Sequence, residues 1–384
     1  MTHVLLLGAG KIGRMIARFL AGSGDYRVRV ADVDRDTLDR LAQRLNVETV
    51  MVDASSRESI AKAMKDCTVV VSALSFRFNP LVAEVCLELG ASYFDLTEDV
   101  ETTRRVRSFA RRARPGQIFM PQCGLAPGFV SIVARHLTHW FDELDTVRMR
   151  VGALPQFPSN QLKYNLTWST DGLINEYCNP CEAIVAGKRT DVLALEGHEH
   201  FDLDGVRYEA FNTSGGLGTL CETLEGKVRE LDYKTVRYPG HRQLARFLVN
   251  ELRMHERRDL LKNILEYAVP ITYQDVVVVF CTATGKRHGR FLQKSDARKI
   301  YQQTIDGELW SAIQVTTASA LCAVVDLHRE GKLPSTGFVT QEQVAYPMFL
   351  ANRFGKHYDT PPVFHHNPHQ ASRSLEEFDA EPME

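Results

Sequence analysis

The sequence predicts an α/β protein in which a doubly wound parallel sheet is followed by a second α+β domain built on a mostly antiparallel sheet. Apolar strand-like runs alternate with helix-like segments from Val4 to Cys123, and this order builds a parallel sheet with helices on both faces. From Leu144 onward the alternation gives way to longer runs of alternating apolar and polar residues, which are typical of antiparallel strands. At 384 residues the chain is too long for one ordinary core, so we expect two domains.

The first strand, turn and helix lie in the stretch "VLLLGAGKIGRMIARFL", residues 4–20. An apolar strand leads into glycines in a G-x-G-x-x-G frame, and the apolar residues that follow recur at helical spacing. Gly8 permits the sharp turn, Gly10 allows backbone amides to approach a pyrophosphate, and Gly13 allows the helix to pack closely on the strand. A tight α/β turn that binds no ligand is the alternative interpretation of this frame.

The second strand ends in Asp32, about 20 residues beyond the glycines, where a carboxylate accepts hydrogen bonds from an adenosine ribose. The glycine frame and this carboxylate together indicate a Rossmann-type dinucleotide domain. A carboxylate here repels a 2′-phosphate, so NAD is the expected cofactor, and nearby Arg35 keeps NADP as the alternative. The residues expected to contact the cofactor are Gly8, Gly10, Lys11, Ile12, Gly13, Asp32, Val33, Asp53, Ala54, Ala73 and Leu74.

The other elements of the first domain, which is expected to span 1–123, follow in regular order. Strands are predicted at 47–53, 67–74, 92–96 and 117–123, and helices at 35–45, 56–66, 80–90 and 99–114. Ser55 or Ser56 is placed to cap the second of these helices, and Gly90 is placed to end the third.

The second domain is expected to span 124–309. Its predicted strands include 146–154, 163–169, 232–240 and 275–285. A long apolar helix at 309–334 then opens a segment, 310–360, that we expect to pack back on the first domain. Residues 361–384 are rich in histidine, proline and acidic residues and are expected to form a flexible tail. Three tail histidines could bind a metal, although a solvated tail is the favoured interpretation: His365, His366 and His369.

Composition excludes several classes of partner. A formal net charge of −2 gives no reason to expect nucleic acid or an anionic membrane, and no apolar run reaches the roughly 20 residues of a spanning helix. The N-terminus shows no secretion signal, so a cytoplasmic location is expected. The eight cysteines are therefore expected to be reduced, and the C-x-x-C of Cys178 and Cys181 lacks the second ligand pair of a zinc site, so no metal is expected.

Several segments together resemble the saccharopine dehydrogenase family. They are, in chain order, "LLLGAGKIG", "CTVVVSAL", "NPLVAEVCLELGASYFDLTED", "CGLAPGF", "VGALPQFPSNQLKYNLTWSTDGLINEY" and "VRYPGH". The resemblance implies that a nicotinamide dinucleotide oxidises a carbon–nitrogen bond in lysine or in a lysine conjugate. It also implies a homodimer that pairs through the sheet of the second domain.

Within that family the chain is most similar to the L-lysine 6-dehydrogenases. Saccharopine enzymes tend to carry Asp where this chain has Ala126, and "CGGLPAP" where it has "VGALPQF". The reaction implied is NAD-dependent oxidative deamination of L-lysine at the ε-carbon, giving 2-aminoadipate 6-semialdehyde, which cyclises to piperideine-6-carboxylate. Two alternatives stay open, namely a glutamate-forming saccharopine dehydrogenase and a non-catalytic NAD-binding redox sensor.

Oxidation of an ammonium-bearing carbon needs a base, because the nitrogen lone pair that expels the hydride exists only after a proton has left. His241 is the first candidate and Glu98 the second, and Arg237 is the candidate clamp for the α-carboxylate of the substrate. Structural roles compete with these, since Glu98 and Asp99 could cap the following helix, Trp168 could belong to the core, and Arg237 could face solvent. The expected substrate contacts are Thr97, Asp99, Cys123, Gly124, Lys163, Tyr164, Trp168, Asp171 and Arg237.

Overall fold

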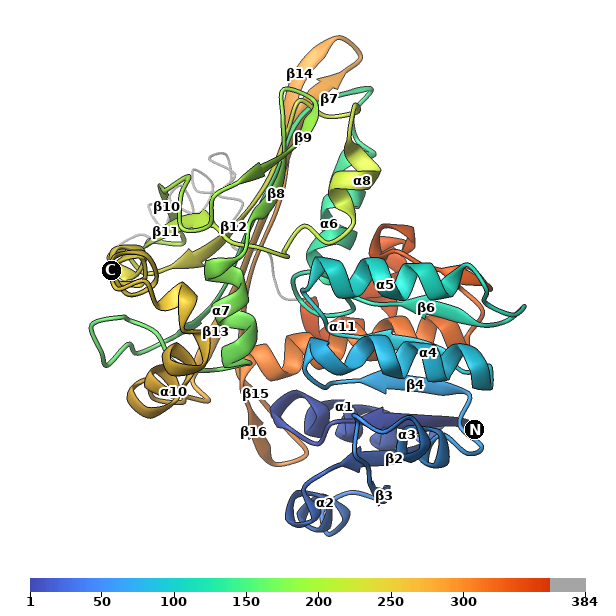
Figure 1. Cartoon of the computed structure of the whole chain (residues 1–384). Helices are drawn as coiled ribbons and strands as arrows, with labels where there is room; N and C mark the ends of the chain where they lie inside the picture. Colours follow the sequence, from blue (N-terminus) through green and yellow to red (C-terminus); the bar gives the residue numbers. More distant parts are fainter. Residues whose placement is uncertain (360–384) are drawn as a thin grey trace, which may run out of the picture.

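The computed structural model of the chain describes residues 1–359 and confirms the predicted fold class, with a parallel sheet beside a mixed sheet (Figure 1). The predicted tail and its three histidines lie outside the described residues. Within 1–359, no helix combines the length and the apolar character that a bilayer crossing needs.

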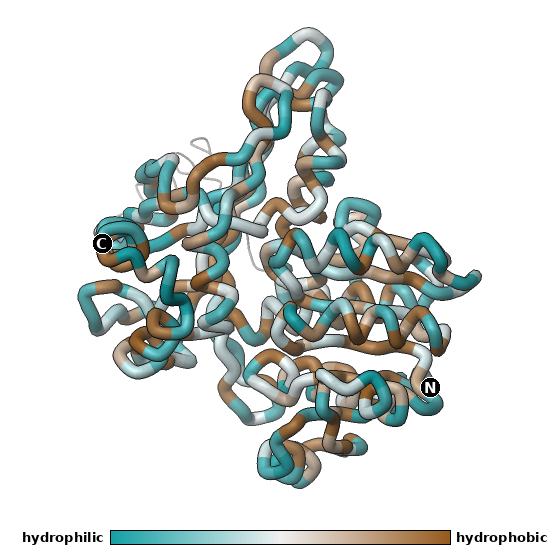
Figure 2. The backbone as a smooth tube through the Cα atoms, in the orientation of Figure 1, coloured by the Kyte–Doolittle hydropathy of each residue, from teal (hydrophilic) through white to brown (hydrophobic). Residues whose placement is uncertain are grey.

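The first sheet has seven parallel strands in the order β17-β6-β5-β4-β1-β2-β3. Figure 2 shows hydrophobic positions gathered along these strands, as expected when helices cover both faces. The strands are β1 (Thr2–Leu7), β2 (Tyr26–Asp32), β3 (Glu48–Met51), β4 (Val69–Ser72), β5 (Ser92–Asp95), β6 (Ile118–Met120) and β17 (Gly337–Phe338). Because β17 pairs with β6, the C-terminal part of the described chain returns to this sheet.

Helices cover the two faces of the first sheet. One face packs against α1, α2 and α11, and the other packs against α3, α4 and α5. Local signals set their ends: the Ser56 hydroxyl accepts from the Ser59 amide at the start of α3, and Gly90, with φ of 82°, ends α4. The helices are α1 (Lys11–Gly22), α2 (Arg35–Ala42), α3 (Arg57–Ala63), α4 (Asn79–Leu89), α5 (Val100–Ala110), α11 (Ala312–Arg329) and α12 (Tyr346–Ala351).

The second sheet has the order β10-β11-β12-β7-β13-β14, with β8 and β9 attached beside β12. Only β12 and β7 run parallel, so the prediction of a mostly antiparallel sheet is confirmed. Its strands are β7 (Glu143–Pro155), β8 (Cys181–Val185), β9 (Lys188–Val192), β10 (Glu199–Leu203), β11 (Val206–Asn212), β12 (Glu230–Arg237), β13 (Asp275–Arg287) and β14 (Arg290–Tyr301). The accompanying elements are α6 (Phe129–Thr138), α7 (Thr170–Cys178), α8 (Leu220–Leu224), α9 (His241–Arg246), α10 (Arg258–Ala268) and the hairpin β15 (Gln303–Ile305) and β16 (Glu308–Trp310).

The strand predicted at 163–169 is wrong. These residues form a loop, and Tyr164 and Leu166 pack into an apolar cluster with helices α7, α9 and α10. Residues 164–167 are all buried, so the alternation of polarity does not correspond to an alternation of exposed and buried faces. The loop is held instead by single hydrogen bonds, such as that from the Leu166 amide to the Pro270 carbonyl at 2.9 Å.

Helix α11 joins the two sheets because its N-terminus is held by the second and its length packs on the first. Asp275, at the start of β13, accepts from the Ala312 amide at 2.5 Å and the Ile313 amide at 3.1 Å, so it caps the helix. Gln314 then donates to the carbonyl of Lys11, in α1, at 3.0 Å. Helices α1 and α11 pack against each other along this contact.

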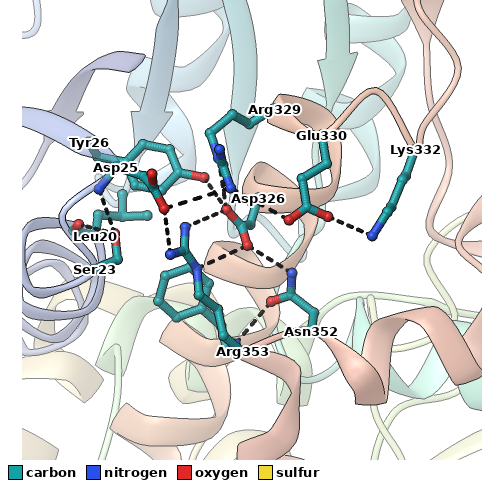
Figure 3. Close-up of polar contacts among 11 residues, drawn as sticks. Leu20, Ser23, Asp25, Tyr26, Asp326, Arg329, Glu330, Lys332, Asn352 and Arg353 are labelled. Atoms are coloured by element: carbon teal, nitrogen blue, oxygen red, sulfur yellow. Dashed lines mark hydrogen bonds and ion pairs between the residues drawn. The ribbon is translucent and has the colours of Figure 1, made fainter. Parts of the chain in front are cut away.

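The far end of α11 is fixed by a polar network around Asp326, a residue only 1% exposed (Figure 3). Its carboxylate accepts from the Tyr26 hydroxyl at 2.7 Å, from the Asn352 amide at 2.9 Å and from the Arg353 guanidinium at 2.8 Å. Arg329 contributes a fourth, more exposed contact at 3.0 Å. This network ties α11 and the segment after it to β2 of the first sheet.

Replacing Asp326 by alanine should destabilise the chain, because the buried donors Tyr26 and Asn352 and the half-buried Arg353 lose the acceptor they share. We expect the free energy of unfolding to fall by about 3 kcal/mol, as when one partner of a buried charge pair is removed, measured by urea denaturation. Arg329→Ala is the matched control, since it removes a half-buried partner of the same carboxylate and should cost under about 1 kcal/mol. Wild-type resistance to urea in Asp326→Ala would contradict this role for the network.

Candidate functional site

The glycine turn after β1 has the geometry of a phosphate cradle. A Cβ on Gly8, whose φ is 99°, would lie 2.9 Å from the Ala73 carbonyl oxygen, and a Cβ on Gly13 would lie 1.9 Å from the Gly8 carbonyl oxygen. These two glycines are therefore required by the turn and by the packing of α1 on β1. At Gly10 a Cβ would meet no protein atom within 4 Å, so the space over this residue is open to a ligand. The residues fit the pyrophosphate of a dinucleotide.

A cavity continues from Gly10 along the end of β2, where the Asp32 carboxylate is held in place. One oxygen accepts from the Ala9 amide at 2.7 Å and the other from the Asp34 amide at 3.0 Å. Arg14 and Arg40 also line this cavity, whereas Arg35, which the sequence offered as a phosphate ligand, does not. The lining also includes Lys11, Arg18 and Arg44, so the cavity joins a carboxylate suited to a ribose with several cations suited to a phosphate.

The cofactor contacts differ from the prediction in two respects. Val33, Asp53 and Ala54 lie after β2 and β3 but line neither this cavity nor the one described next. In their place the β15–β16 hairpin supplies Glu308 and Trp310 to the cavity wall. This hairpin comes from the distant segment before α11, so nothing in the first domain's sequence indicates its position.

A second cavity, of about 180 Å³, lies where the carboxyl ends of the first sheet's strands meet the second sheet. The first domain supplies Ile12, Ala73, Leu74, Leu96, Thr97 and Glu98 to its lining, and the second supplies Gly124, Pro127, Trp168, Asp171, Glu176, Tyr233, Thr235 and Arg237. Ile313 and Thr317 of α11 complete the wall. Ile12, Ala73 and Leu74 belong to the predicted cofactor set, and Ile12 is the neighbour of Lys11 in the lining of the first cavity, so the two cavities adjoin the same turn.

Two carboxylates from different domains line this cavity. Glu98 follows β5, and Glu176 lies on α7. Helix α7 approaches Glu98 closely at Gly172, where an added Cβ would lie 2.4 Å from the Trp168 ring and 3.3 Å from the Glu98 carboxylate. Burial raises the pKa of Glu98 to about 7. Burial also raises the pKa of Glu176 to about 8, against the opposing effect of the Arg237 charge. Both groups can thus exchange protons near neutral pH.

Arg237, the last residue of β12, brings a positive charge to the same cavity. It is only 2% exposed, so the alternative of a solvent-facing strand arginine is wrong. Its Nε donates to the Tyr177 hydroxyl at 3.0 Å, and its guanidinium lies over the Tyr164 ring, 4.8 Å from the centroid. Nη2 has no hydrogen-bond partner among residues 1–359, so it is available to a carboxylate in the cavity.

The geometry argues against His241 as the base. Its Nδ1 lies 2.7 Å from the Leu162 carbonyl, which can only accept, so Nδ1 carries the proton and Nε2 accepts from the Tyr177 hydroxyl at 2.9 Å. Burial, with the nearby Arg237 charge, lowers the pKa of His241 to about 3. The ring lies outside the cavity lining and positions Tyr177, which in turn contacts Arg237.

The other predicted substrate contacts divide between binding and structure. Asp99 accepts from the Thr102 amide at 2.7 Å and so caps α5, while its neighbour Glu98 lines the cavity. Cys123 is fully buried and contacts Gln341 instead. Lys163 is exposed and donates to the Pro239 carbonyl, and Tyr164 lies behind Arg237. The residues that do reach the cavity are Thr97, Gly124, Trp168, Asp171 and Arg237.

Three further residues line the cavity without having been predicted from the sequence, namely Glu176, Tyr233 and Thr235. Glu176 stands in "GLINEY", where a single carboxylate interrupts apolar residues of α7, and that isolation was the available signal. Tyr233 and Thr235 alternate with Arg237 along β12, so all three side chains share one face of the strand. Arg237, which the sequence predicted as the carboxylate clamp, therefore lies on the same strand face as Tyr233 and Thr235.

Comparisons with known proteins match both domains. A family model described as saccharopine dehydrogenase NADP binding domain matches residues 4–119, and one described as saccharopine dehydrogenase C-terminal domain matches residues 124–356. The chain is 25% identical over 329 residues to the saccharopine dehydrogenase [NADP(+), L-glutamate-forming] of Saccharomyces cerevisiae, which covers 80% of this chain and 69% of that protein.

Longer proteins match this chain over only a smaller part of their own length. The chain is 22% identical over 250 residues to the mitochondrial alpha-aminoadipic semialdehyde synthase of Mus musculus, covering 58% of this chain, and it spans only 27% of that protein. In structure, the apo saccharopine dehydrogenase (L-Glu forming) from Saccharomyces cerevisiae superposes with a TM-score of 0.75 at 17% identity, covering 91% of this chain and 96% of that chain. This structural likeness confirms the fold.

Replacing Gly10 by valine should abolish dinucleotide binding while the fold persists, because the added side chain fills ligand space and touches no protein atom. Titration with NAD followed by calorimetry measures the binding, and circular dichroism checks the fold. Gly13→Val is the matched comparison, since its Cβ clashes with Gly8 and should cost the fold itself. A Gly10→Val chain that binds NAD normally would show that the turn is only structural.

Proposed function

The chain belongs to the saccharopine dehydrogenase family, whose members are oxidoreductases acting on CH–NH groups, and we propose that it oxidises the ε-carbon of L-lysine with NAD. The product is 2-aminoadipate 6-semialdehyde, which cyclises to piperideine-6-carboxylate. Among the CH–NH substrates that the family allows, L-lysine is the one proposed for this chain.

The charge of the cavity carries this choice. Among residues 1–359, Arg237 is the only cationic side chain that lines the cavity, and the acidic side chains of the lining are Glu98, Glu176 and Asp171, of which Asp171 is paired with Lys262 at 2.7 Å. L-Lysine has one carboxylate, which matches this one cation, and two ammonium groups, which match the acidic side chains. Saccharopine has three carboxylates, two of which would have no cation in the lining to pair with.

A neighbouring cavity extends the acidic surface. It shares Glu98 and Glu176 with the first cavity and adds Glu101, Glu182 and Asp191, with Arg104 as its cation. An approaching ammonium group is attracted by such a surface, whereas an additional carboxylate is repelled. This arrangement supports an amine-rich substrate.

The residues divide the chemical tasks. Arg237 binds the α-carboxylate through its unpaired guanidinium N–H groups, and Trp168 packs along the methylene chain. Glu98 takes a proton from the ε-ammonium group, which frees the nitrogen lone pair. The oxidised nicotinamide supplies the hydride acceptor. Water then adds to the iminium carbon, and ammonia leaves as the aldehyde forms.

We propose NAD rather than NADP as the cofactor because the Asp32 carboxylate is fixed by two backbone amides at the site of the ribose hydroxyls. The family model is described as an NADP binding domain, and the yeast relative is named as an NADP(+) enzyme. Arg14 and Arg40 are the cations that would hold a 2′-phosphate in that alternative.

The expected homodimer stays a prediction. Strand β14 is an edge of the second sheet and exposes Phe291 and Leu292, so backbone and apolar groups are both available to another copy.

Incubation of the chain with NAD and separate amines, followed by NADH absorbance, tests the substrate. We expect L-lysine to be turned over, and saccharopine, L-ornithine and simple diamines to react at least about tenfold more slowly, a difference of about 1.4 kcal/mol. Turnover of saccharopine alone would favour the glutamate-forming reaction. NAD binding without turnover of any amine would favour the redox sensor, and either outcome would contradict the proposal.

Replacing Glu98 by glutamine should lower kcat for the preferred amine by about 100-fold, the usual effect of losing a general base. In the wild type, kcat/KM should fall as the pH drops below about 7, because protonated Glu98 cannot accept the ammonium proton. Glu98→Gln should lack this acidic limb. Glu251→Gln is the control, since Glu251 is exposed and lines neither cavity, and an unchanged pH profile in Glu98→Gln would assign the base to another group.

A further inference from the structure

A second cluster of chemically active side chains lies on the β10–β11 hairpin, away from the cavity. His198 precedes β10, His200 lies within it, and Glu209 stands opposite His200 in the register of the two antiparallel strands. One ligand atom from each of the three residues lies within 4.8 Å of the other two. No other such group of histidine, cysteine and carboxylate side chains occurs in the part of the chain that the structure describes.

We propose that His198, His200 and Glu209 bind one divalent transition-metal ion, for which Zn²⁺ is the reference. Two imidazoles and a carboxylate are a ligand set that zinc and its neighbours accept, and water completes the coordination. The Nε2 of His198 lies 3.3 Å from Oε2 of Glu209. That separation is close to the edge of a zinc tetrahedron with bonds of about 2.0 Å.

Glu209 is pre-positioned for this role. Its side chain is buried, and its two oxygens accept from the Arg242 amide at 2.6 Å and the Gly240 amide at 3.0 Å. A ligating carboxylate held by hydrogen bonds of this kind needs little reorganisation when the metal binds. The two imidazoles are exposed and can rotate toward the metal, so the fixed ligand lies at the base of the site and the mobile ones at its opening.

The arginine whose backbone amide donates to Glu209 is already paired through its side chain. The Arg242 guanidinium donates to Glu196 at 2.8 Å. This pair reduces the repulsion that a bound dication would meet. Glu209 is also paired with Arg237 in the β11–β12 ladder, so the metal would tie the hairpin to the strand end that carries the clamp. The role inferred is structural support of that strand end.

Titration of the chelator-treated full chain with ZnCl₂, followed by calorimetry, tests the site. We expect one ion per chain and a higher thermal unfolding temperature when zinc is present. The double variant His198→Ala and His200→Ala should bind at least about tenfold more weakly. Because both side chains are exposed, this variant should keep the fold, which circular dichroism checks.

Two controls separate this site from other histidines. His139→Ala with His288→Asn removes two histidines outside the cluster and should leave zinc binding unchanged. A triple alanine variant of the tail histidines should also bind zinc normally: His365, His366 and His369. Loss of binding in the tail variant, with retention in the His198 and His200 variant, would overturn the proposal.

Replacement of zinc by Co²⁺ provides a second readout. Visible absorption of the bound cobalt should report nitrogen and oxygen ligands in the wild type and should be absent in the His198 and His200 variant. A wild-type chain that binds neither ion would leave a hydrogen bond between His198 and Glu209 as the whole role of the cluster, and the proposal would fail.

Discussion

The cavity between the two sheets depends on helix α11, because different domains hold its two ends. Asp275 of the second sheet caps its first turn, and the network around Asp326 fixes its last turns to β2. Ile313 and Thr317, near the capped end, form part of the cavity wall. The distance between the Glu98 and Arg237 sides of the cavity is therefore set by how this one helix is anchored.

Burial then determines the chemistry of the groups that α11 brings together. Two carboxylates that would be ionised in water acquire pKa values of about 7 and about 8, so one can accept a proton while the other retains one at neutral pH. The same burial lowers the pKa of His241 to about 3 and makes the ring a neutral support for Tyr177. These pKa values support the proposal that Glu98 is the base and that His241 positions Tyr177.

The sequence predicted what short-range patterns determine and missed what long-range contacts determine. The three glycine roles and the carboxylate at the end of β2 follow from one strand–turn–helix–strand unit, and each has the expected geometry. The partners of His241 are Leu162 and Tyr177, which no spacing rule links to it. Glu176 was missed because its position depends on the approach of α7 to Glu98, and the β15–β16 hairpin because it reaches the nucleotide cavity from the far end of the chain.

The central claim is that one buried arginine pairs with the single carboxylate of the substrate while the acidic wall holds its amines. Comparison of kcat/KM for L-lysine and for cadaverine, which lacks the carboxylate, in the wild type and in Arg237→Lys tests it most directly. The account predicts that the variant loses about tenfold for lysine, about 1.4 kcal/mol, and almost nothing for cadaverine. An equal loss for both amines would show that Arg237 supports the fold of the site and does not recognise the carboxylate.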